Sequence, residues 1–269
     1  MRTNKKYKLG VIGLGHMGLA IAKGAVRKEY LQRFEVALFD PSKKAQEYGK
    51  REGFTCLENV QEITKECHIV LLAVTPKILN SVLAELKGCD IDVLLSIVTG
   101  ASIAHIQEVL GNVPVIRAMP NTPLQINAGS TALCMSSNCK ADDYDFVFQL
   151  FASMGVTRTI SEDKMNDIVA VHGSTPAYVY YFVDCILKDA VQRGIDEEAA
   201  RALLVQTVIG AGQLLAKNAS KPLDEFIKEV ATEGGTTIEA ITTLKEEKMD
   251  EIIHDANENC IARAKQLGK

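Results

Sequence analysis

The first 160 residues alternate between short apolar segments and longer helical ones, and this alternation is the strongest constraint on the fold. The apolar segments, each expected to form a strand, span residues 8–12, 36–39, 69–74, 93–98 and 113–119, with further strands at 130–135 and 157–160. Helices are expected between them, over residues 17–28, 43–52, 76–86, 102–110 and 142–154. Continuous apolar strands separated by helices are typical of a parallel sheet covered on both faces. The sequence therefore predicts an α/β domain over residues 1–160.

From residue 161 the pattern changes, because strand-like runs stop and helical segments remain. Helices are expected over residues 162–171, 176–193, 197–217, 223–231, 237–246 and 249–266. The stretch 177–187, AYVYYFVDCIL, is apolar on nearly every face and too short to span a bilayer. We expect it to be buried, partly against a second subunit. The sequence predicts an all-helical domain over residues 161–269.

A glycine-rich segment, GLGHMG, follows the first strand and opens the first helix. In this context GxGxxG indicates a Rossmann-like dinucleotide-binding domain: the first glycine permits a tight turn, the second admits a pyrophosphate, and the third lets the helix pack on the strand. The alternative is a glycine turn in a flavodoxin-like sheet that binds nothing. The cofactor-binding residues predicted here are Gly13, Leu14, Gly15, His16, Met17 and Gly18.

Asp40 ends the second strand at the spacing of about 20 residues that the fingerprint requires. A carboxylate there accepts hydrogen bonds from a ribose 2′-OH and repels a 2′-phosphate. Lys43 and Lys44 would offset this repulsion only if they turned inward. The cofactor is therefore NADH or NADPH, and Asp40 favours NADH.

Composition excludes several other classes of function. The chain has 30 Lys and Arg against 34 Asp and Glu, a net charge of −4, which argues against nucleic-acid binding.

No apolar run approaches the roughly 18 residues of a membrane span, and the N-terminal residues do not resemble a signal peptide, so we expect no membrane partner. The seven cysteines are scattered without metal-ligand spacing, which predicts thiols in a reducing cytoplasm and no metal site. His68, His105 and His254 have no partner spacing and are assigned no role.

Several further segments, in this order, resemble the pyrroline-5-carboxylate reductase family over nearly the whole chain. They are the glycine loop, LAVTP (72–76), RAMPNTP (117–123), GSTPAY (173–178) and ATEGGTT (231–237). The glycine loop alone also fits the β-hydroxyacid dehydrogenases, whereas MPNTP and EGGTT are specific to the reductases.

The resemblance implies an N-terminal Rossmann-like domain followed by a C-terminal all-helical dimerisation domain. Two chains would interlock through their helices into a homodimer, and family members often assemble further into rings of dimers. The active site would lie between the nucleotide domain of one subunit and the helical domain of its pair. The small-molecule substrate would be 1-pyrroline-5-carboxylate, reduced at its C=N carbon to L-proline in the last step of proline biosynthesis.

The segment GGTT precedes an apolar-periodic stretch, and Thr236 with Glu239 forms a capping-box pattern, so a helix should begin here. A helix N-terminus behind two glycines suits a carboxylate by the same physics that suits a phosphate. On the capping pattern alone the segment is a simple helix cap. The resemblance places the substrate carboxylate here, with contacts to Thr232, Gly235, Thr236 and Thr237.

The remaining site residues lie at the carboxyl edge of the sheet, where ligands bind in open α/β folds. Asn121 follows a strand between two prolines and is predicted to bind substrate, although a turn asparagine is the alternative. The resemblance adds cofactor contacts at Ala73, Val74, Thr75, Pro76 and Asn59. A protonated imine is already electrophilic, so little acid–base machinery is required, and Thr175 (predicted catalytic) or Tyr181 would orient the ring nitrogen or pass a proton.

Three residues depart from the family pattern: His172 in place of serine, Thr75 in place of lysine, and Glu233 where proline is frequent. They leave other functions open. The chain could reduce another cyclic imine or act like a β-hydroxyacid dehydrogenase. It could also be a non-catalytic dinucleotide sensor, although such a protein has no evident reason to keep the EGGTT cap.

Overall fold

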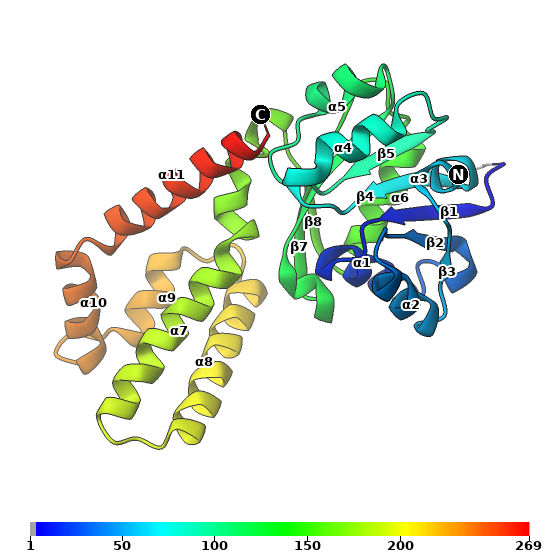
Figure 1. Cartoon of the computed structure of the whole chain (residues 1–269). Coiled ribbons are helices and arrows are strands. Elements are labelled where there is room, and N and C mark those ends of the chain that lie inside the picture. Colours follow the sequence, from blue (N-terminus) through cyan, green and yellow to red (C-terminus); the bar gives the residue numbers. More distant parts are fainter. Residues whose placement is uncertain (1–3, 269) are drawn as a thin grey trace. The chain divides into compact units, whose positions relative to one another are not determined.

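The computed structural model describes residues 4–268, and the first part of that chain forms one eight-stranded sheet (Figure 1). The strands are β1 (Tyr7–Ile12), β2 (Val36–Phe39), β3 (Thr55–Cys56), β4 (Cys67–Leu72), β5 (Val93–Ser96), β6 (Val115–Pro120), β7 (Gly129–Met135) and β8 (Gly155–Thr159). Their order is β3-β2-β1-β4-β5-β6-β7-β8. The predicted α/β class is confirmed, but the sheet is not wholly parallel, because β7 runs antiparallel to β6.

Helices cover both faces of this sheet. They are α1 (His16–Arg27), α2 (Lys43–Arg51), α3 (Val60–Glu66), α4 (Pro76–Leu86), α5 (Ile103–Leu110) and α6 (Ala141–Ala152). Successive strand residues point to opposite faces. In β4, Val70 and Leu72 pack with α3, α4 and α5, whereas Ile69 and Leu71 pack with α1 and α6. The continuous apolar strands in the sequence therefore reflect burial on both faces.

The later part of the chain is helical, in keeping with the prediction. Its helices are α7 (Thr175–Gln192), α8 (Glu197–Lys217), α9 (Leu223–Val230), α10 (Thr236–Glu246) and α11 (Met249–Leu267).

The helix predicted over residues 162–171 is wrong. A 3-10 turn over Glu162–Lys164 and a π-helical turn over Val169–Gly173 take its place. Contacts with distant segments override the helical pattern. Glu162 accepts a hydrogen bond from the backbone N–H of Ile103, at the start of α5, at 2.6 Å, and Asn166 accepts one from the buried Arg117 of β6 at 2.7 Å.

The chain divides into two compact units, one formed by residues up to Pro176 together with Cys260 onward, the other by Ala177–Asn259. The predicted boundary between the two domains, at residues 160 and 161, stays a prediction.

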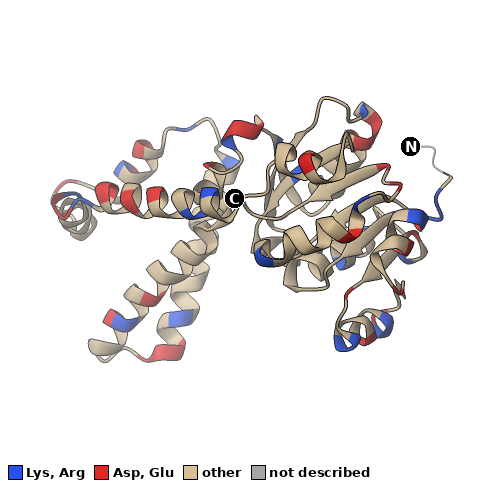
Figure 2. Ribbon diagram, turned by 45° about the horizontal axis from the view of Figure 1, so that its top comes forward, with Lys and Arg blue, Asp and Glu red and all other residues tan. Residues whose placement is uncertain are grey.

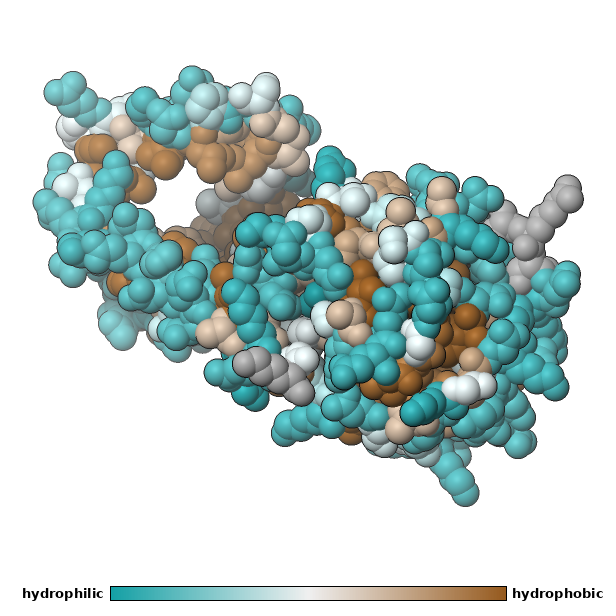
Figure 3. All heavy atoms as spheres, turned by 90° about the horizontal axis from the view of Figure 1, so that it is seen from above, coloured by the Kyte–Doolittle hydropathy of each residue, from teal (hydrophilic) through white to brown (hydrophobic). Residues whose placement is uncertain are grey.

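Apolar side chains gather on the surface of the helical unit (Figure 3). Within a single chain the apolar stretch of α7 is not buried as we expected: Tyr180 and Tyr181 are 64% and 71% exposed. The reason is the small interior of this unit, in which Leu187 is the buried residue of α7. Helix α8 is long and apolar enough to cross a membrane by length and composition, which corrects the expectation that no segment approaches this limit. One such helix is weak evidence for a membrane span, because helices covered by protein pass the same test.

Acidic and basic residues are interspersed along the ribbon (Figure 2). Such mixing gives no single-signed field of the kind that attracts nucleic acid. The absence of a nucleic-acid partner nevertheless stays a prediction.

Candidate active site

The first glycine of the GLGHMG loop occupies a position that other residues would strain. Gly13 has φ +99°, and a Cβ there would lie 2.6 Å from the carbonyl oxygen of Ala73. Its N–H donates to the carbonyl of Phe39 at the end of β2. The glycine therefore lets the chain turn sharply between β1 and α1 while touching the segment that leaves β4.

The other two glycines of the motif, Gly15 and Gly18, differ in the space around them, and so in their roles. A Cβ on Gly18 would lie 2.1 Å from the carbonyl oxygen of Gly13, so α1 packs tightly on the loop here. A Cβ on Gly15 would meet nothing within 4 Å, and Gly15 is the N-cap of α1, at φ −69°. A hollow of about 490 Å³ adjoins this point, with Leu14, Gly15 and His16 in its lining. The space beside Gly15 and the first N–H groups of α1 suit a pyrophosphate.

Asp40 sits beside the loop and already shapes it. Its Oδ2 accepts a hydrogen bond from the backbone N–H of Leu14 at 2.8 Å, and its Oδ1 accepts one from that of Ser42 at 2.8 Å. A carboxylate has roughly four lone-pair sites, so both oxygens keep capacity for a ribose hydroxyl. Lys43 and Lys44 are exposed at the start of α2.

The segment that follows β4 lies against the glycine loop, as the sheet topology requires. A Cβ on Gly13 would contact Ala73 and Val74. Thr75 is the N-cap of α4, and Pro76 is its first residue. The structure thus brings this predicted segment to Gly13. Asn59, by contrast, caps α3, since its Oδ1 accepts a hydrogen bond from the N–H of Glu62 at 2.8 Å. Its contact with the cofactor stays a prediction.

At the far end of the same edge, Asn121 is buried at the end of β6. Its side-chain amide accepts a hydrogen bond from the N–H of Ser130 and donates one to the carbonyl of His172. No motif or spacing in the sequence indicated that these residues meet. Thr175 begins α7, and its hydroxyl donates to the carbonyl of Val171 at 2.7 Å. The hydroxyl oxygen therefore remains available as an acceptor.

In the helical unit, α10 begins at Thr236, one residue before the predicted range of 237–246, and the predicted capping box is wrong. Gly235 is the N-cap, and no side chain caps the helix. The loop closes instead through its backbone, with the N–H of Gly235 donating to the carbonyl of Thr232 at 3.0 Å. Because no side chain covers them, the first N–H groups of α10 remain available to an anion.

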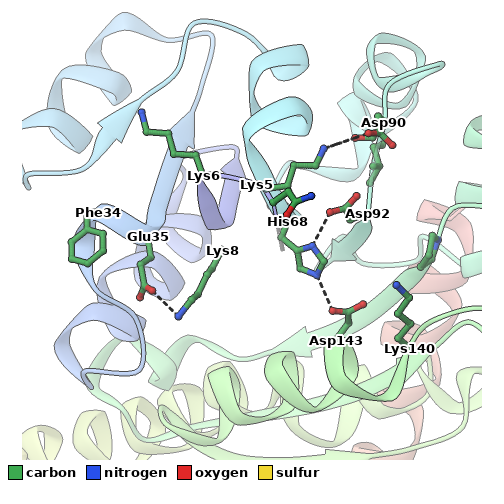
Figure 4. Close-up of a pocket in the computed structure, with 13 residues that line it drawn as sticks. Lys5, Lys6, Lys8, Phe34, Glu35, His68, Asp90, Asp92, Lys140 and Asp143 are labelled. Carbon is green, nitrogen blue, oxygen red and sulfur yellow. Dashed lines mark hydrogen bonds and ion pairs between the residues drawn. The ribbon is translucent and has the colours of Figure 1, made fainter. Parts of the chain in front are cut away.

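A second hollow, of about 990 Å³, lies at the opposite edge of the sheet (Figure 4). There His68 joins Asp92 at 2.7 Å and Asp143 at 2.8 Å through its two ring nitrogens. These residues stand where β4, β5 and α6 begin, so the histidine ties three elements together. Ligands in this fold bind at the carboxyl ends of the strands, so we assign this cluster a structural role.

Two features of residues 4–268 bear on metal and thiol chemistry. No group of three or more His, Cys, Asp or Glu side chains in that range could hold a metal ion. Burial raises the pKa of the Cys67 and Cys134 thiols to about 12, which disfavours the reactive thiolate.

Burial lowers the pKa of His172 below its ordinary value of 6.5, because desolvation penalises the imidazolium. At pH values between the lowered pKa of His172 and 6.5, this histidine binds more protons in the unfolded chain than in the folded one. Stability is therefore lost as the pH falls through this window. We expect the melting temperature of the wild type to drop more steeply from about pH 7.5 to about pH 5.5 than that of a His172→Asn variant. Equal slopes in thermal denaturation would contradict this.

The fold and the loop geometry define a dinucleotide-dependent oxidoreductase with a helical second unit. A family model described as NADP oxidoreductase, coenzyme F420-dependent, matches residues 8–100, and one described as pyrroline-5-carboxylate reductase dimerisation matches residues 162–267. Among curated relatives, the pyrroline-5-carboxylate reductase of Escherichia coli K12 is 30% identical, covering 97% of this chain and 98% of the relative. That of Vibrio alginolyticus is 29% identical, with coverage of 97% and 98%.

Solved structures agree over the same length. Pyrroline carboxylate reductase from Plasmodium falciparum, with NADP bound, has a TM-score of 0.89 at 28% identity, covering 98% of this chain and 99% of its own. The 1-pyrroline-5-carboxylate reductase of Streptococcus pyogenes has a TM-score of 0.88 at 28% identity, with coverage of 96% and 98%. This chain belongs to the pyrroline-5-carboxylate reductase family, and the predicted family is confirmed.

Proposed function

We propose that this chain is an NAD(P)H-dependent reductase of 1-pyrroline-5-carboxylate, acting on its C=N bond to give L-proline. The observation that carries this conclusion is the similarity to curated reductases over nearly the full length of both chains. Two features of the chain support it: a glycine loop of the dinucleotide-binding type in the first unit, and a helix start without a side-chain cap, suited to an anion, in the second.

The glycine loop fits a nicotinamide dinucleotide. The open side of Gly15 leaves room that a Cβ would fill, and the uncapped start of α1 faces that room with backbone N–H groups. When bound, the reduced nicotinamide supplies the hydride. We propose that Gly13 to Gly18, Asp40, Asn59 and residues 73–76 bind this cofactor.

The start of α10 is our proposed site for the substrate carboxylate. The N–H groups of Thr236 and Thr237 lie in the first turn of the helix, where the dipole favours a negative group. Gly235 and Thr232 complete the loop, and Gly234, at φ +71°, shapes it. Thr232 and Thr236 are exposed, so their hydroxyls are accessible to a small acid.

In this reaction the main task of the protein is to hold and orient the imine and the reduced cofactor. A protonated imine accepts hydride without further activation, so positioning contributes most of the rate. Thr175 is our proposed residue for orienting the ring nitrogen. Because its proton is donated to Val171, it would accept a hydrogen bond from the imine N–H rather than give one.

We further propose that the apolar surface of α7 and α8 is covered by a second copy of the chain. The family model for these residues describes dimerisation. Leu203 and Tyr181 are each 71% exposed, which is unfavourable for a helix that meets only water. A homodimer, its assembly into a ring of dimers, and a cytoplasmic location all belong to this proposal.

Steady-state kinetics with 1-pyrroline-5-carboxylate and each reduced cofactor tests the function. Imine-dependent oxidation of either cofactor supports it. Turnover with other cyclic imines alone would reassign the substrate, and cofactor binding without any turnover would indicate a sensor.

The same assay tests the role of Asp40. We expect the wild type to prefer NADH and an Asp40→Asn variant to raise the NADPH-to-NADH ratio of kcat/KM by about 10-fold or more, because the charge facing a 2′-phosphate is lost. The ratio is compared rather than either rate, because Asp40→Asn also removes the oxygen that accepts a hydrogen bond from Leu14 or from Ser42. That loss would weaken the binding of both cofactors. Lys43→Ala is the matched control: a lower ratio in that variant would show that the lysine turns inward and that Asp40 does not decide the preference.

A further inference from the structure

Asn121 is buried at the end of β6, with 8% of its surface exposed, and both ends of its amide have backbone partners. Its Oδ1 accepts a hydrogen bond from the N–H of Ser130 at 2.9 Å. Its Nδ2 donates to the carbonyl of His172 at 3.1 Å. A side chain that was expected to contact substrate is thus engaged with the protein itself.

A third contact closes these residues into a ring. The Ser130 hydroxyl and the Nδ1 of His172 lie 3.0 Å apart, within hydrogen-bond distance. Ser130 belongs to β7, Asn121 follows β6, and His172 lies in the π-helical turn Val169–Gly173. We call Asn121, Ser130 and His172 the edge cluster.

The edge cluster fixes the π-helical turn to the carboxyl edge of the sheet. Gly173 packs near Met119 of β6, and Val169 is buried against the same core. Thr175, two residues after the turn ends, donates a hydrogen bond from its hydroxyl back to the carbonyl of Val171. π-helical turns are rare and frequent at functional sites, which fits the placement of this one. In a doubly wound sheet the nicotinamide half of a dinucleotide lies toward this side of the strand order.

We propose that Asn121, Ser130 and His172 are positioning residues: together they hold the π-helical turn, and with it Thr175, in the shape that hydride transfer requires. This inference rests on the proposed reductase function. The edge cluster acts through the geometry of the backbone, and its members need not touch the substrate. A displacement of about 1 Å in such a support can cost about 100-fold in rate, so the effect is measurable in kcat.

A double-mutant cycle tests the proposal. We expect Asn121→Ala and Ser130→Ala each to lower kcat by about 10- to 100-fold, with KM for the imine changed less than about threefold. The double variant should be no worse than the poorer single one, because both changes release the same turn. Asn121→Asp should not rescue, since its second oxygen would face the carbonyl of His172.

Ser136→Ala is the matched control. Ser136 stabilises the other end of the same strand pair, where its hydroxyl accepts a hydrogen bond from the N–H of Val115 at 2.9 Å. Hydrogen exchange in residues 165–176 should accelerate in the edge-cluster variants and stay unchanged in Ser136→Ala, whose kcat should match the wild type.

The opposite pattern would overturn the proposal. In that case Asn121→Ala would raise KM for the imine by about 10-fold at constant kcat, and the effects of the two substitutions would add in the double variant. Hydrogen exchange in residues 165–176 would be unchanged, and Asn121 would be a substrate contact. Hydrogen exchange needs no imine turnover. A wild type without reductase activity would therefore refute the proposed function, while exchange would still decide whether the cluster holds the turn.

Discussion

Replacing Gly15 by alanine is expected to weaken NADH binding by about 100-fold, or about 3 kcal/mol, while leaving the melting temperature unchanged. The fold tolerates the methyl group, because a Cβ at Gly15 meets no atom within 4 Å and the backbone φ is −69°. The bound pyrophosphate does not tolerate it, because the methyl group fills the space through which the phosphates reach the N–H groups of α1. Fluorescence titration of NADH and thermal denaturation measure the two effects separately.

Gly18→Ala is the contrasting variant. Its Cβ would lie 2.1 Å from the carbonyl oxygen of Gly13, so the loop and α1 must separate. We expect the melting temperature to fall by about 5–10 °C, with cofactor binding lost as a consequence. If Gly15→Ala lowered the melting temperature as much as Gly18→Ala, or bound NADH as well as the wild type, the assignment of the open glycine to the pyrophosphate would fail.

A Leu203→Asp variant is expected to be monomeric and nearly inactive. Leu203 lies on α8 and is 71% exposed in the single chain, so the proposed partner subunit would cover it. Burying an unpaired carboxylate in an apolar interface costs several kcal/mol; about 4 kcal/mol would raise the dissociation constant about a thousandfold. Light scattering after gel filtration measures the mass, and imine-dependent NADH oxidation should fall by about 100-fold or more if the dimer completes the site.

Gln206→Glu adds the same charge at a polar position of the same helix and serves as the control. It should remain dimeric and active. A Leu203→Asp protein that stayed dimeric would show that α8 is covered in some other way, and a monomer with full activity would show that one chain contains the whole site.

The predictions that succeeded concern features that neighbouring residues decide. The strand–glycine–helix order at residues 8–28 specifies the loop because the turn and the helix start depend on a few consecutive residues. The start of α10 was predicted to within one residue for the same reason, since the expected range began at 237 and the helix begins at Thr236.

Of the predictions that failed, one concerns a local helix cap and the other concerns contacts between distant segments. The capping box at Thr236 and Glu239 is locally plausible, yet Gly235 is the cap and the loop closes through Thr232. The helix expected over residues 162–171 is replaced by two short turns, because Arg117 binds Asn166 from β6, 49 positions away in the sequence. Periodicity does not carry such information.

The sequence by itself determined the class of the first unit, the helical nature of the second, the glycine loop and the family, because these follow from local pattern and from motifs at fixed spacing. The tertiary structure alone decided which side chains share the edge of the sheet. His68 meets Asp92 and Asp143, and Asn121 meets Ser130 and His172, only after strands and helices far apart in the chain come together. A hydrogen bond depends on distances of a few ångströms, and between distant residues those distances are set by how the elements pack.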